Sequence, residues 1–181
     1  NQLDMEKSKK EVYTCRIFTV WEEEFALPDG KTTKQSWVDH KPTVAVVAVN
    51  DQNEILLIRQ FRNPAKQVLW EIPAGTMDKA TESPAQCALR ELAEETGYSA
   101  RSITPLFAGY LLPGYCNEYM HFFLASGLVY KPLPPDESEF IEVTPTGFEQ
   151  TDRLIRQGEI IDAKTVLGVM LARQYLTTYP T

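Results

Sequence analysis

The sequence predicts an α/β protein with one main domain and a small β unit before it. Short apolar runs bounded by turn residues, which are typical of strands, fill much of the chain. Apolar residues recur at helical spacing after Pro84, and again in two segments near the C-terminal end. With 181 residues, 43% of them hydrophobic, the chain is long enough to bury a core of its own.

The first segment, residues 5–40, is predicted to form an antiparallel β unit. Val12–Trp21 and Thr32–Asp39 have the composition of strands, and the turn residues Pro28, Asp29 and Gly30 lie between them. Residues 12–40 are too few to bury a core of their own, so we expect them to dock on another surface. A second copy of the chain is the expected surface, and the expected assembly is a homodimer.

The main domain is predicted over residues 41–178. Val44–Val49 and Ile55–Ile58 are apolar runs on either side of a polar turn, and they predict a buried hairpin of central strands. The same signals predict the remaining elements, which are strands at Val68–Ile72, Ile103–Tyr110, Tyr119–Leu124 and Phe140–Val143 and helices at Phe148–Gln157 and Ala163–Tyr175.

The helix predicted over residues 84–96 has clear signals at both ends. Ser83 is a candidate N-cap, Pro84 suits the first helical position, and Gln86 stands in the register of a capping box. Gly97 is a typical C-terminal stop. One face of this helix is apolar and can pack on the sheet. That face contains Ala85, Leu89 and Leu92.

Three glutamates of this helix, Glu91, Glu94 and Glu95, fall on one face because they stand at positions i, i+3 and i+4. Like charges at this spacing destabilise a helix by about 0.2–0.5 kcal/mol per pair, so we expect something to neutralise them. Arg90 can pair with Glu94 at i+4. Carboxylate oxygens grouped in this way suit Mg²⁺ or Mn²⁺, and these ions suit phosphate substrates. The alternative is a solvated acidic helix face, which is the usual role of a charged run.

These residues belong to a longer pattern that resembles the Nudix box. The family motif is G-x5-E-x7-R-E-U-x-E-E-x-G-U, in which U is a bulky apolar residue. The chain matches every fixed position from Glu82 to Tyr98, and it departs from the motif by having six residues, not five, between Gly75 and Glu82. The matching residues are Gly75, Glu82, Arg90, Glu91, Glu94, Glu95, Gly97 and Tyr98.

The resemblance extends to the ADP-ribose and nucleotide-sugar pyrophosphatases within this family. Pro113 stands fifteen positions beyond the box, where ADP-ribose hydrolases commonly carry proline. Taken alone, each further matching stretch also has a structural interpretation as core, turn or solvated loop. These stretches are Arg59–Arg62, Trp70–Gly75, Leu112–Gly114 with Glu118, Glu137–Val143 and Gly158–Thr165.

The resemblance implies a Nudix α/β/α sandwich with a mixed β-sheet, preceded here by the small antiparallel β unit. It also implies a hydrolase that cleaves the pyrophosphate of ADP-ribose and related nucleoside-diphosphate sugars, giving a nucleoside monophosphate and a sugar phosphate. Mg²⁺, with Mn²⁺ as the alternative, is the implied cofactor that activates water. Its implied ligands are Glu91 and Glu95, which thereby count as catalytic, with Glu94 and the backbone carbonyl of Ala74.

The remaining roles implied by the resemblance concern the catalytic base and the substrate. Glu139 is the implied base, with Glu137 as the alternative. Arg62 is expected to contact a substrate phosphate, because a guanidinium group matches phosphate bidentately. Glu118 is expected to orient water or ribose, and Pro113 to belong to the same substrate loop. Trp37, or Trp21, is implied to stack on the adenine, with ordinary packing as the alternative.

Composition excludes several other classes of function. The net charge of −7 leaves no basic surface for a nucleic acid polymer. The apolar runs are too short to span a bilayer and no signal segment is recognisable, so we expect a cytoplasmic protein with no membrane partner. Three cysteines without paired spacing indicate free thiols, and only two histidines argue against a zinc site or a histidine-based triad.

Two alternative functions remain after the sequence is considered. One is hydrolysis of another Nudix substrate, such as a dinucleoside polyphosphate, NADH or an oxidised nucleoside triphosphate. The other is a non-enzymatic sensor of ADP-ribose. The sensor is disfavoured, because the chain keeps all four glutamates of the box and has no basic appendage.

Overall fold

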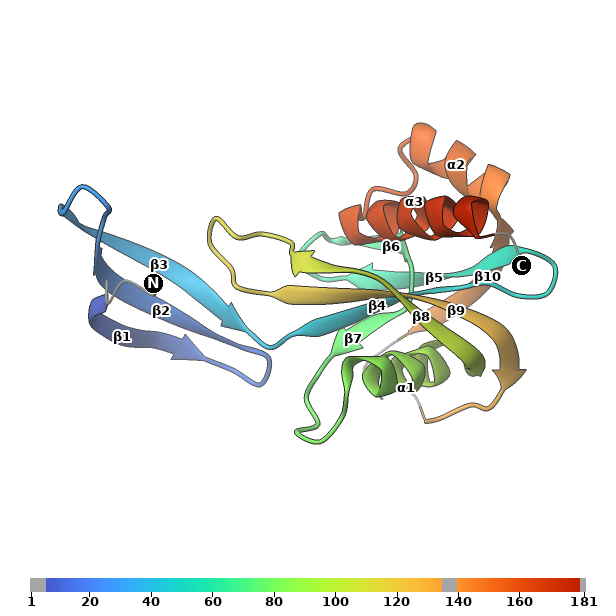
Figure 1. Ribbon diagram of the computed structural model, residues 1–181, viewed down its shortest axis with the longest axis horizontal. Helices are drawn as coiled ribbons and strands as arrows, with labels where there is room; N and C mark the ends of the chain where they lie inside the picture. The colour runs from blue at the N-terminus through green and yellow to red at the C-terminus, as the bar shows by residue number, and fades with distance from the viewer. Residues whose placement is uncertain (1–5, 135–139, 180–181) are drawn as a thin grey trace. The chain divides into compact units, whose positions relative to one another are not determined.

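The computed structural model describes residues 6–134 and 140–179. The chain forms two compact units. The first unit is made of Asn1–Pro42 with Gly109–Tyr119, and the second of Thr43–Ala108 with Met120–Thr181. Each unit has a sheet structure of its own (Figure 1).

The first unit contains a three-stranded antiparallel sheet in the order β1–β2–β3. Its strands are β1 (Glu6–Thr14), β2 (Phe18–Ala26) and β3 (Thr32–His40). The prediction of one strand at Val12–Trp21 is wrong, because the chain turns at residues 15–17, where the Cys15 amide donates to the Phe18 carbonyl oxygen at 3.0 Å. This turn contains neither glycine nor proline, so the sequence carries no common turn signal there.

Gly109–Tyr119 joins the first unit because its backbone pairs with β3. The Val38 amide donates to the Tyr115 carbonyl oxygen at 2.7 Å, and the Asn117 amide donates to the Val38 carbonyl oxygen at 3.1 Å. The side-chain oxygen of Asn117 accepts a further hydrogen bond from the His40 amide at 2.7 Å. A segment distant in the sequence is therefore part of the N-terminal unit.

The second unit is an α/β/α sandwich, with α1 on one side of its sheets and α2 and α3 on the other (Figure 1). One sheet has the order β7–β4–β9–β8 and is mixed, because β4 is parallel to β9 and antiparallel to β7. The other, β10–β5–β6, is antiparallel. The predicted sandwich with a mixed sheet is confirmed. Its elements are β4 (Thr43–Ala48), β5 (Glu54–Arg62), β6 (Gln67–Glu71), β7 (Ala74–Thr76), α1 (Pro84–Thr96), β8 (Tyr98–Tyr110), β9 (Tyr119–Tyr130), β10 (Ile141–Gly147), α2 (Phe148–Arg156) and α3 (Ala163–Thr178).

The predicted hairpin of β4 and β5 is wrong. The polar turn between them forms, with the Asn50 side chain accepting from the Gln52 and Glu54 amides at 3.0 and 2.8 Å. Beyond the single bridge between Val49 and Ile55, however, the two strands belong to different sheets. All six residues of β4 are buried. A run that is buried on both faces has no polar alternation to indicate its neighbours, so the sequence could not distinguish these arrangements.

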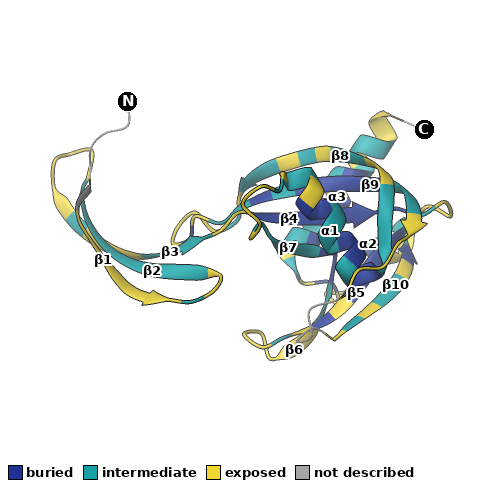
Figure 2. Cartoon of the chain, turned by 90° about the horizontal axis from the view of Figure 1, so that it is seen from below, coloured by how far each residue is buried: buried dark blue, intermediate teal, exposed yellow. Residues whose placement is uncertain are grey.

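The core lies between the sheets and the helices of the second unit, where buried residues are concentrated (Figure 2). Ala88 and Leu92 of α1 pack there with Val44 and Val46 of β4 and Phe123 of β9, all of them buried. Ala85 and Leu89, which were predicted on the same helical face, are only half-buried. The buried face is therefore rotated from the predicted one, toward Cys87 and Ala88.

Both ends of α1 form as predicted. The Ser83 hydroxyl accepts from the Gln86 amide at 3.3 Å, and the Gln86 side chain accepts from the Ser83 amide at 2.9 Å. Gly97 ends the helix in the left-handed region at φ +78°, where its amide donates to the Ala93 carbonyl oxygen at 3.1 Å. These caps fix the register of the helix that carries the clustered glutamates.

The two C-terminal helices, α2 and α3, confirm the predicted helical segments. Asp162 is the N-cap of α3, where its carboxylate accepts from the Thr165 amide at 3.1 Å. A Cβ atom on Gly168 would lie 2.6 Å from the Cδ1 atom of Ile72, so glycine permits α3 to lie this close to the sheet. Within residues 6–134 and 140–179, no helix is long and apolar enough to cross a membrane.

Candidate active site

The three clustered glutamates of α1 are largely shielded from solvent. The side chains of Glu91 and Glu94 are 13% and 26% exposed, and Glu95 is buried at 7%. A solvated acidic helix face would leave these carboxylates in water. The structure therefore excludes that interpretation and shows a part-buried carboxylate cluster instead.

Arg90 lies at the centre of this cluster. Its Nε and Nη2 atoms donate to the two carboxylate oxygens of Glu82, each at 2.9 Å. Its Nη1 atom donates to Glu91 at 2.6 Å and to Glu94 at 2.9 Å, which confirms the predicted i, i+4 pair. The hydrogen bonds from Arg90 lower the pKa of the Glu82 carboxyl below its ordinary value. Arg90 thus binds three carboxylates, those of Glu82, Glu91 and Glu94, and its Nη2 atom lies 3.5 Å from a fourth, that of Asp78.

The thiol beneath Arg90 has a structural role. The Arg90 Nη2 atom lies 3.3 Å from Cys87 Sγ, and Cys87 is fully buried. Burial raises the pKa of the Cys87 thiol to about 12. The thiol therefore stays protonated and unreactive at neutral pH.

The strand β7 forms the other wall of the cluster. The Ala74 amide donates to Glu95 Oε2 at 3.0 Å. A Cβ atom on Gly75 would lie 2.0 Å from the carboxyl carbon of Glu91, so any larger residue would displace that carboxylate. Gly75 lies against Glu91, and Glu82 pairs with Arg90. Both residues therefore reach the helix α1 although six residues, not five, separate them. The additional residue is accommodated in the intervening loop.

The donor atoms of this site fit a hard divalent cation. Carboxylate oxygens and backbone carbonyl oxygens are the ligands that Mg²⁺ and Mn²⁺ prefer. In the described part of the chain, no three His, Cys, Asp or Glu side chains already surround a common metal position. Glu91 and Glu94 instead point an oxygen at Arg90, and Glu95 points one at the Ala74 amide.

Arg62 pairs with a buried carboxylate. Its Nε and Nη2 atoms donate to the two oxygens of Glu71, each at 2.7 Å, and Lys164 contacts the same carboxylate. Glu71 is 1% exposed. Burial alone would raise the pKa of the Glu71 carboxyl, but the hydrogen bonds and positive charges of Arg62 and Lys164 lower it below its ordinary value. The expected contact between Arg62 and a substrate phosphate stays a prediction.

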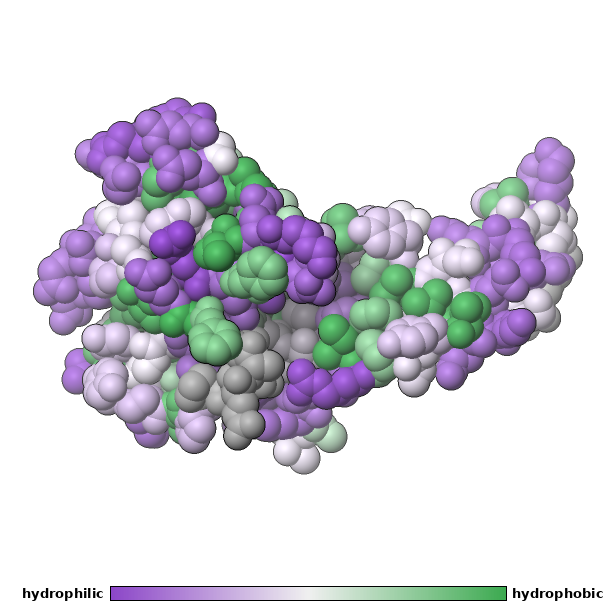
Figure 3. Space-filling model, turned by 180° about the vertical axis from the view of Figure 1, so that it is seen from behind, coloured by the Kyte–Doolittle hydropathy of each residue, from purple (hydrophilic) through white to green (hydrophobic). Residues whose placement is uncertain are grey.

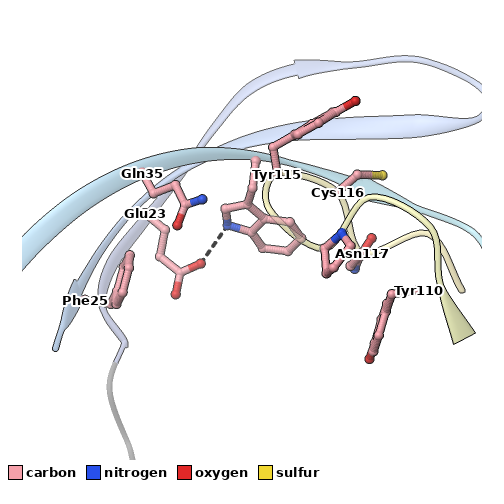
Figure 4. A pocket seen from close by; sticks show the side chains of 9 residues that line it. Glu23, Phe25, Gln35, Tyr110, Tyr115, Cys116 and Asn117 are labelled. Carbon is pink, nitrogen blue, oxygen red and sulfur yellow. Dashed lines mark hydrogen bonds between the residues drawn. The ribbon is translucent and has the colours of Figure 1, made fainter. Parts of the chain in front are cut away.

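Trp37 and Pro113 line a cavity of about 460 Å³ in the first unit (Figure 4). The Trp37 Nε1 atom donates to Glu23 at 2.7 Å, and this bond is the dashed line in the figure. The ammonium group of Lys9 lies 4.6 Å from the Trp37 ring centroid and 4.4 Å from the Trp21 centroid. The Trp37 indole therefore has two charged partners, the Glu23 carboxylate and the Lys9 ammonium group. The other lining residues are Phe25, Gln35, Tyr110, Tyr115, Cys116 and Asn117.

Apart from Arg62, which lies in the second unit and binds Glu71, the predicted site residues fall into three groups. Glu91, Glu94, Glu95 and Ala74 lie together in the second unit. Trp37, Pro113 and Glu118 lie in the first unit, and the Glu118 amide contacts Cys116 Sγ, at the cavity, at 3.4 Å. Glu139, the predicted base, and its alternative Glu137 lie outside the described residues.

The pairing of Glu71 with Lys164 was missed by sequence reasoning. The two residues are 93 positions apart, so no local pattern links them. One signal was available, because Glu71 interrupts an otherwise apolar strand and a buried carboxylate requires a cationic partner. The identity of that partner required the fold.

Comparison with known proteins shows what this chain resembles. The family model described as the NUDIX domain matches residues 39–166. The chain is 39% identical to the ADP-ribose pyrophosphatase of Bacillus subtilis (strain 168), over 93% of this chain and 90% of that protein. It is 34% identical to the methanol dehydrogenase activator of Bacillus methanolicus, over 92% and 89% of the two chains. It is 31% identical to a GDP-mannose pyrophosphatase of Yersinia enterocolitica, over 93% and 95%.

A solved structure supports the fold. The crystal structure of an ADP compounds hydrolase superimposes with a TM-score of 0.86, covering 98% of this chain and 97% of that chain. The two sequences are 23% identical, so this likeness concerns the fold alone.

We predict that Arg90→Met lowers the free energy of unfolding at pH 7 by about 3–5 kcal/mol, because it leaves part-buried carboxylates without their cation. The stability that Glu82 gains from its lowered pKa is present above the unfolded value and is lost as the pH falls through the folded value. The difference between the wild type and Arg90→Met should therefore be largest near neutral pH and shrink below the ordinary carboxyl pKa of 4.5.

Urea unfolding between pH 4 and pH 7 measures this difference. Arg59→Met is the matched control, because Arg59 pairs with the exposed Glu142 at 3.4 Å. Its effect should stay within about 0.5 kcal/mol at every pH. A loss from Arg90→Met that is independent of pH would contradict the assignment of the carboxylates as its partners.

Proposed function

Because the chain belongs to the Nudix family, we propose that it hydrolyses the pyrophosphate of ADP-ribose and related nucleoside-diphosphate sugars. The observation that carries this proposal is the part-buried cluster of four box glutamates beside Arg90, which we propose binds a divalent cation next to the pyrophosphate. The names of two relatives, an ADP-ribose pyrophosphatase and a GDP-mannose pyrophosphatase, support the substrate class.

The cofactor is Mg²⁺, with Mn²⁺ as the alternative. Glu91 and Glu95 are the principal ligands, with Glu94 and the Ala74 carbonyl oxygen completing the set. The bound cation supplies positive charge that offsets the charge on the phosphates and lowers the pKa of water. Arg90 holds the Glu91 and Glu94 carboxylates in place through the hydrogen bonds of its Nη1 atom.

Hydrolysis breaks one bridging P–O bond of the pyrophosphate. A water oxygen forms the new bond to phosphorus, and its proton passes to a base, for which we propose Glu139 with Glu137 as the alternative. The bridging oxygen leaves with the other phosphate. From ADP-ribose the products are AMP and ribose 5-phosphate.

Several residues are proposed to hold the rest of the substrate. Arg62 contacts a phosphate, and Glu118 orients water or ribose. The cavity lined by Trp37 and Pro113 receives the adenine, which stacks on the indole ring. Its polar groups, including the Glu23 carboxylate, can accept hydrogen bonds from a base.

The substrate class is tested by a screen of nucleotide sugars, dinucleotides and nucleoside triphosphates with Mg²⁺, in which the products are identified by chromatography. We expect AMP and ribose 5-phosphate from ADP-ribose at the highest kcat/KM. Preferred cleavage of a dinucleoside polyphosphate, NADH or an oxidised triphosphate would assign the chain to another Nudix substrate. Binding of ADP-ribose without any product would indicate a sensor.

We predict that Glu95→Gln lowers kcat by about 10²–10⁴-fold and leaves the fold intact, because it removes a carboxylate that binds the cation. Steady-state assays at saturating Mg²⁺, with circular dichroism for the fold, measure this. Glu149→Gln, on the exposed first turn of α2, is the control and should retain normal turnover. Full activity of Glu95→Gln would rule out this ligand.

The second functional prediction concerns the base. Glu139→Gln should lower kcat by about 10²–10⁴-fold and barely change KM, because proton transfer occurs in the transition state. Glu137→Gln is the matched variant two positions away. If Glu137→Gln gives that pattern and Glu139→Gln is near normal, the base is Glu137. A main effect of Glu139→Gln on the half-saturating Mg²⁺ concentration would make Glu139 a ligand instead.

The N-terminal sheet supports a further part of the proposal, a homodimer. Among residues 8–42, no side chain is buried, as the burial map shows (Figure 2). Apolar side chains appear between hydrophilic ones on its surface (Figure 3), and Val12 and Tyr13 are 58% and 56% exposed. A sheet without a core of its own gains stability by docking on a second copy.

We therefore predict a dimer in sedimentation velocity at nanomolar concentration, the range used for activity assays. Replacing the exposed apolar pair, Val12→Glu with Tyr13→Glu, should weaken it, because burying the new charges is unfavourable. A wild-type monomer that is fully active at that concentration would count against the dimer.

A further inference from the structure

Lys164 and Thr165 lie in the first turn of α3. They bind Glu71 and Ile72, in the segment that borders the carboxylate cluster. The Lys164 ammonium group donates to Asp162 at 2.8 Å and also contacts the buried Glu71 carboxylate. The Lys164 side chain is 12% exposed and Thr165 is fully buried. A lysine buried to this degree requires anionic or hydrogen-bonding partners. Its ion pair with Glu71 therefore connects α3 to the end of β6.

Thr165 makes a second tie to the same segment. Its hydroxyl donates to Asp162 at 2.6 Å and accepts from the Ile72 amide at 2.8 Å. The Asp162 carboxylate also accepts from the Thr165 amide, which fixes the first turn of α3. Through one buried hydroxyl, the N-cap of α3 therefore sets the position of the Ile72 backbone.

The tied segment continues directly into the carboxylate cluster. The Pro73 carbonyl oxygen accepts from the Val46 amide at 2.8 Å, and the Ala74 amide donates to Glu95 at 3.0 Å. Gly75 then lies against the Glu91 carboxylate. The residues from Glu71 to Ala74 are thus bound to β5, α3, β4 and α1, and the contacts of Lys164 and Thr165 lie at one end of this series.

We propose that Lys164 and Thr165 are positioning residues for the hydrolytic reaction. They hold residues 71–75 in place, and this segment in turn sets Ala74 and the carboxylates of Glu91 and Glu95. The hydrogen bonds of Lys164 and Thr165 go to Glu71, Ile72 and Asp162, so their effect on the carboxylates of α1 passes through residues 71–75 and the Glu71 side chain. The inference rests on the proposed function, since it takes the carboxylate cluster to be the catalytic site.

The alternative is a purely structural role in anchoring α3, and a matched control separates the two. Arg173 also ties α3 to the rest of the second unit, through Asp152 and through the Phe148 carbonyl oxygen at 3.0 Å. It makes no contact with residues 71–75 in these interactions. Arg173→Met therefore removes an anchor of α3 and leaves the segment beside the carboxylates untouched.

The experiment compares Lys164→Met, Lys164→Arg and Arg173→Met in the full chain. Outer partners of a metal site typically change metal affinity or activity by about 10–100-fold. Lys164→Met should lower kcat and raise the half-saturating Mg²⁺ concentration by factors in that range, while KM for ADP-ribose changes far less. Lys164→Arg should restore much of both. Arg173→Met should lower the unfolding midpoint and leave both kinetic quantities unchanged.

Amide hydrogen exchange gives a readout that does not depend on activity. In Lys164→Met the Ile72 and Ala74 amides should exchange at least tenfold faster than in Arg173→Met, because the tie at Glu71 is lost. Thr165→Val keeps the size of the side chain and should also accelerate exchange at the Ile72 and Ala74 amides. This second variant tests the proposal if Lys164→Met does not fold. Unchanged exchange at both amides in these variants overturns the proposal.

Failure of the inference and failure of the proposed function give different results. If the wild type cleaves no nucleoside-diphosphate sugar, the function is wrong. If it cleaves ADP-ribose and Glu95→Gln abolishes this, but Lys164→Met and Thr165→Val behave like Arg173→Met, the function stands. The positioning role is then wrong.

Discussion

The site depends on one interaction, the binding of Arg90 to the glutamates that surround it. Like charges at helical spacing destabilise α1, and burying them raises the cost further. A guanidinium group has five N–H donors in a rigid plane, and Arg90 uses them on Glu82, Glu91 and Glu94 together. The helix can therefore bury Leu92 on one side and still hold carboxylates on the other. Because these groups are shielded from water, the electrostatic interactions between them are stronger than they would be in solvent.

A second buried carboxylate, Glu71, differs from those of α1 in its partners. Glu71 has two cationic partners, Arg62 and Lys164, and its charge is balanced within the protein. On α1 the glutamates outnumber their arginine. Both clusters border the same short segment, which ties Ile72 to α3 and Ala74 to Glu95. The cluster around Glu71 therefore holds the backbone, and the carboxylates of α1 are the groups that we propose to bind the cation.

The sequence predicted those features that are local in the chain. The caps of α1, the Arg90–Glu94 pair and the mixed-sheet sandwich implied by the box are all found in the structure. It did not predict that β4 and β5 separate into two sheets, since a strand buried on both faces carries no register signal. It also missed the tie between Glu71 and Lys164, whose partners meet only when α3 packs on β6. Contacts of long sequence separation depend on topology, which residue spacing does not encode.

The groups proposed to bind the pyrophosphate and those proposed to bind the base belong to different units. The groups proposed to bind the cation and the pyrophosphate belong to the second unit, whereas the aromatic cavity around Trp37 belongs to the first. The pyrophosphate is common to all nucleoside-diphosphate sugars, so the carboxylate cluster cannot distinguish one base from another. Under the proposed assignment, discrimination between bases arises in the cavity of the first unit, whose lining includes the polar side chains of Glu23 and Gln35. We therefore expect substitutions in that cavity to change the preferred nucleotide without disturbing the hydrogen bonds between Arg90 and its glutamates.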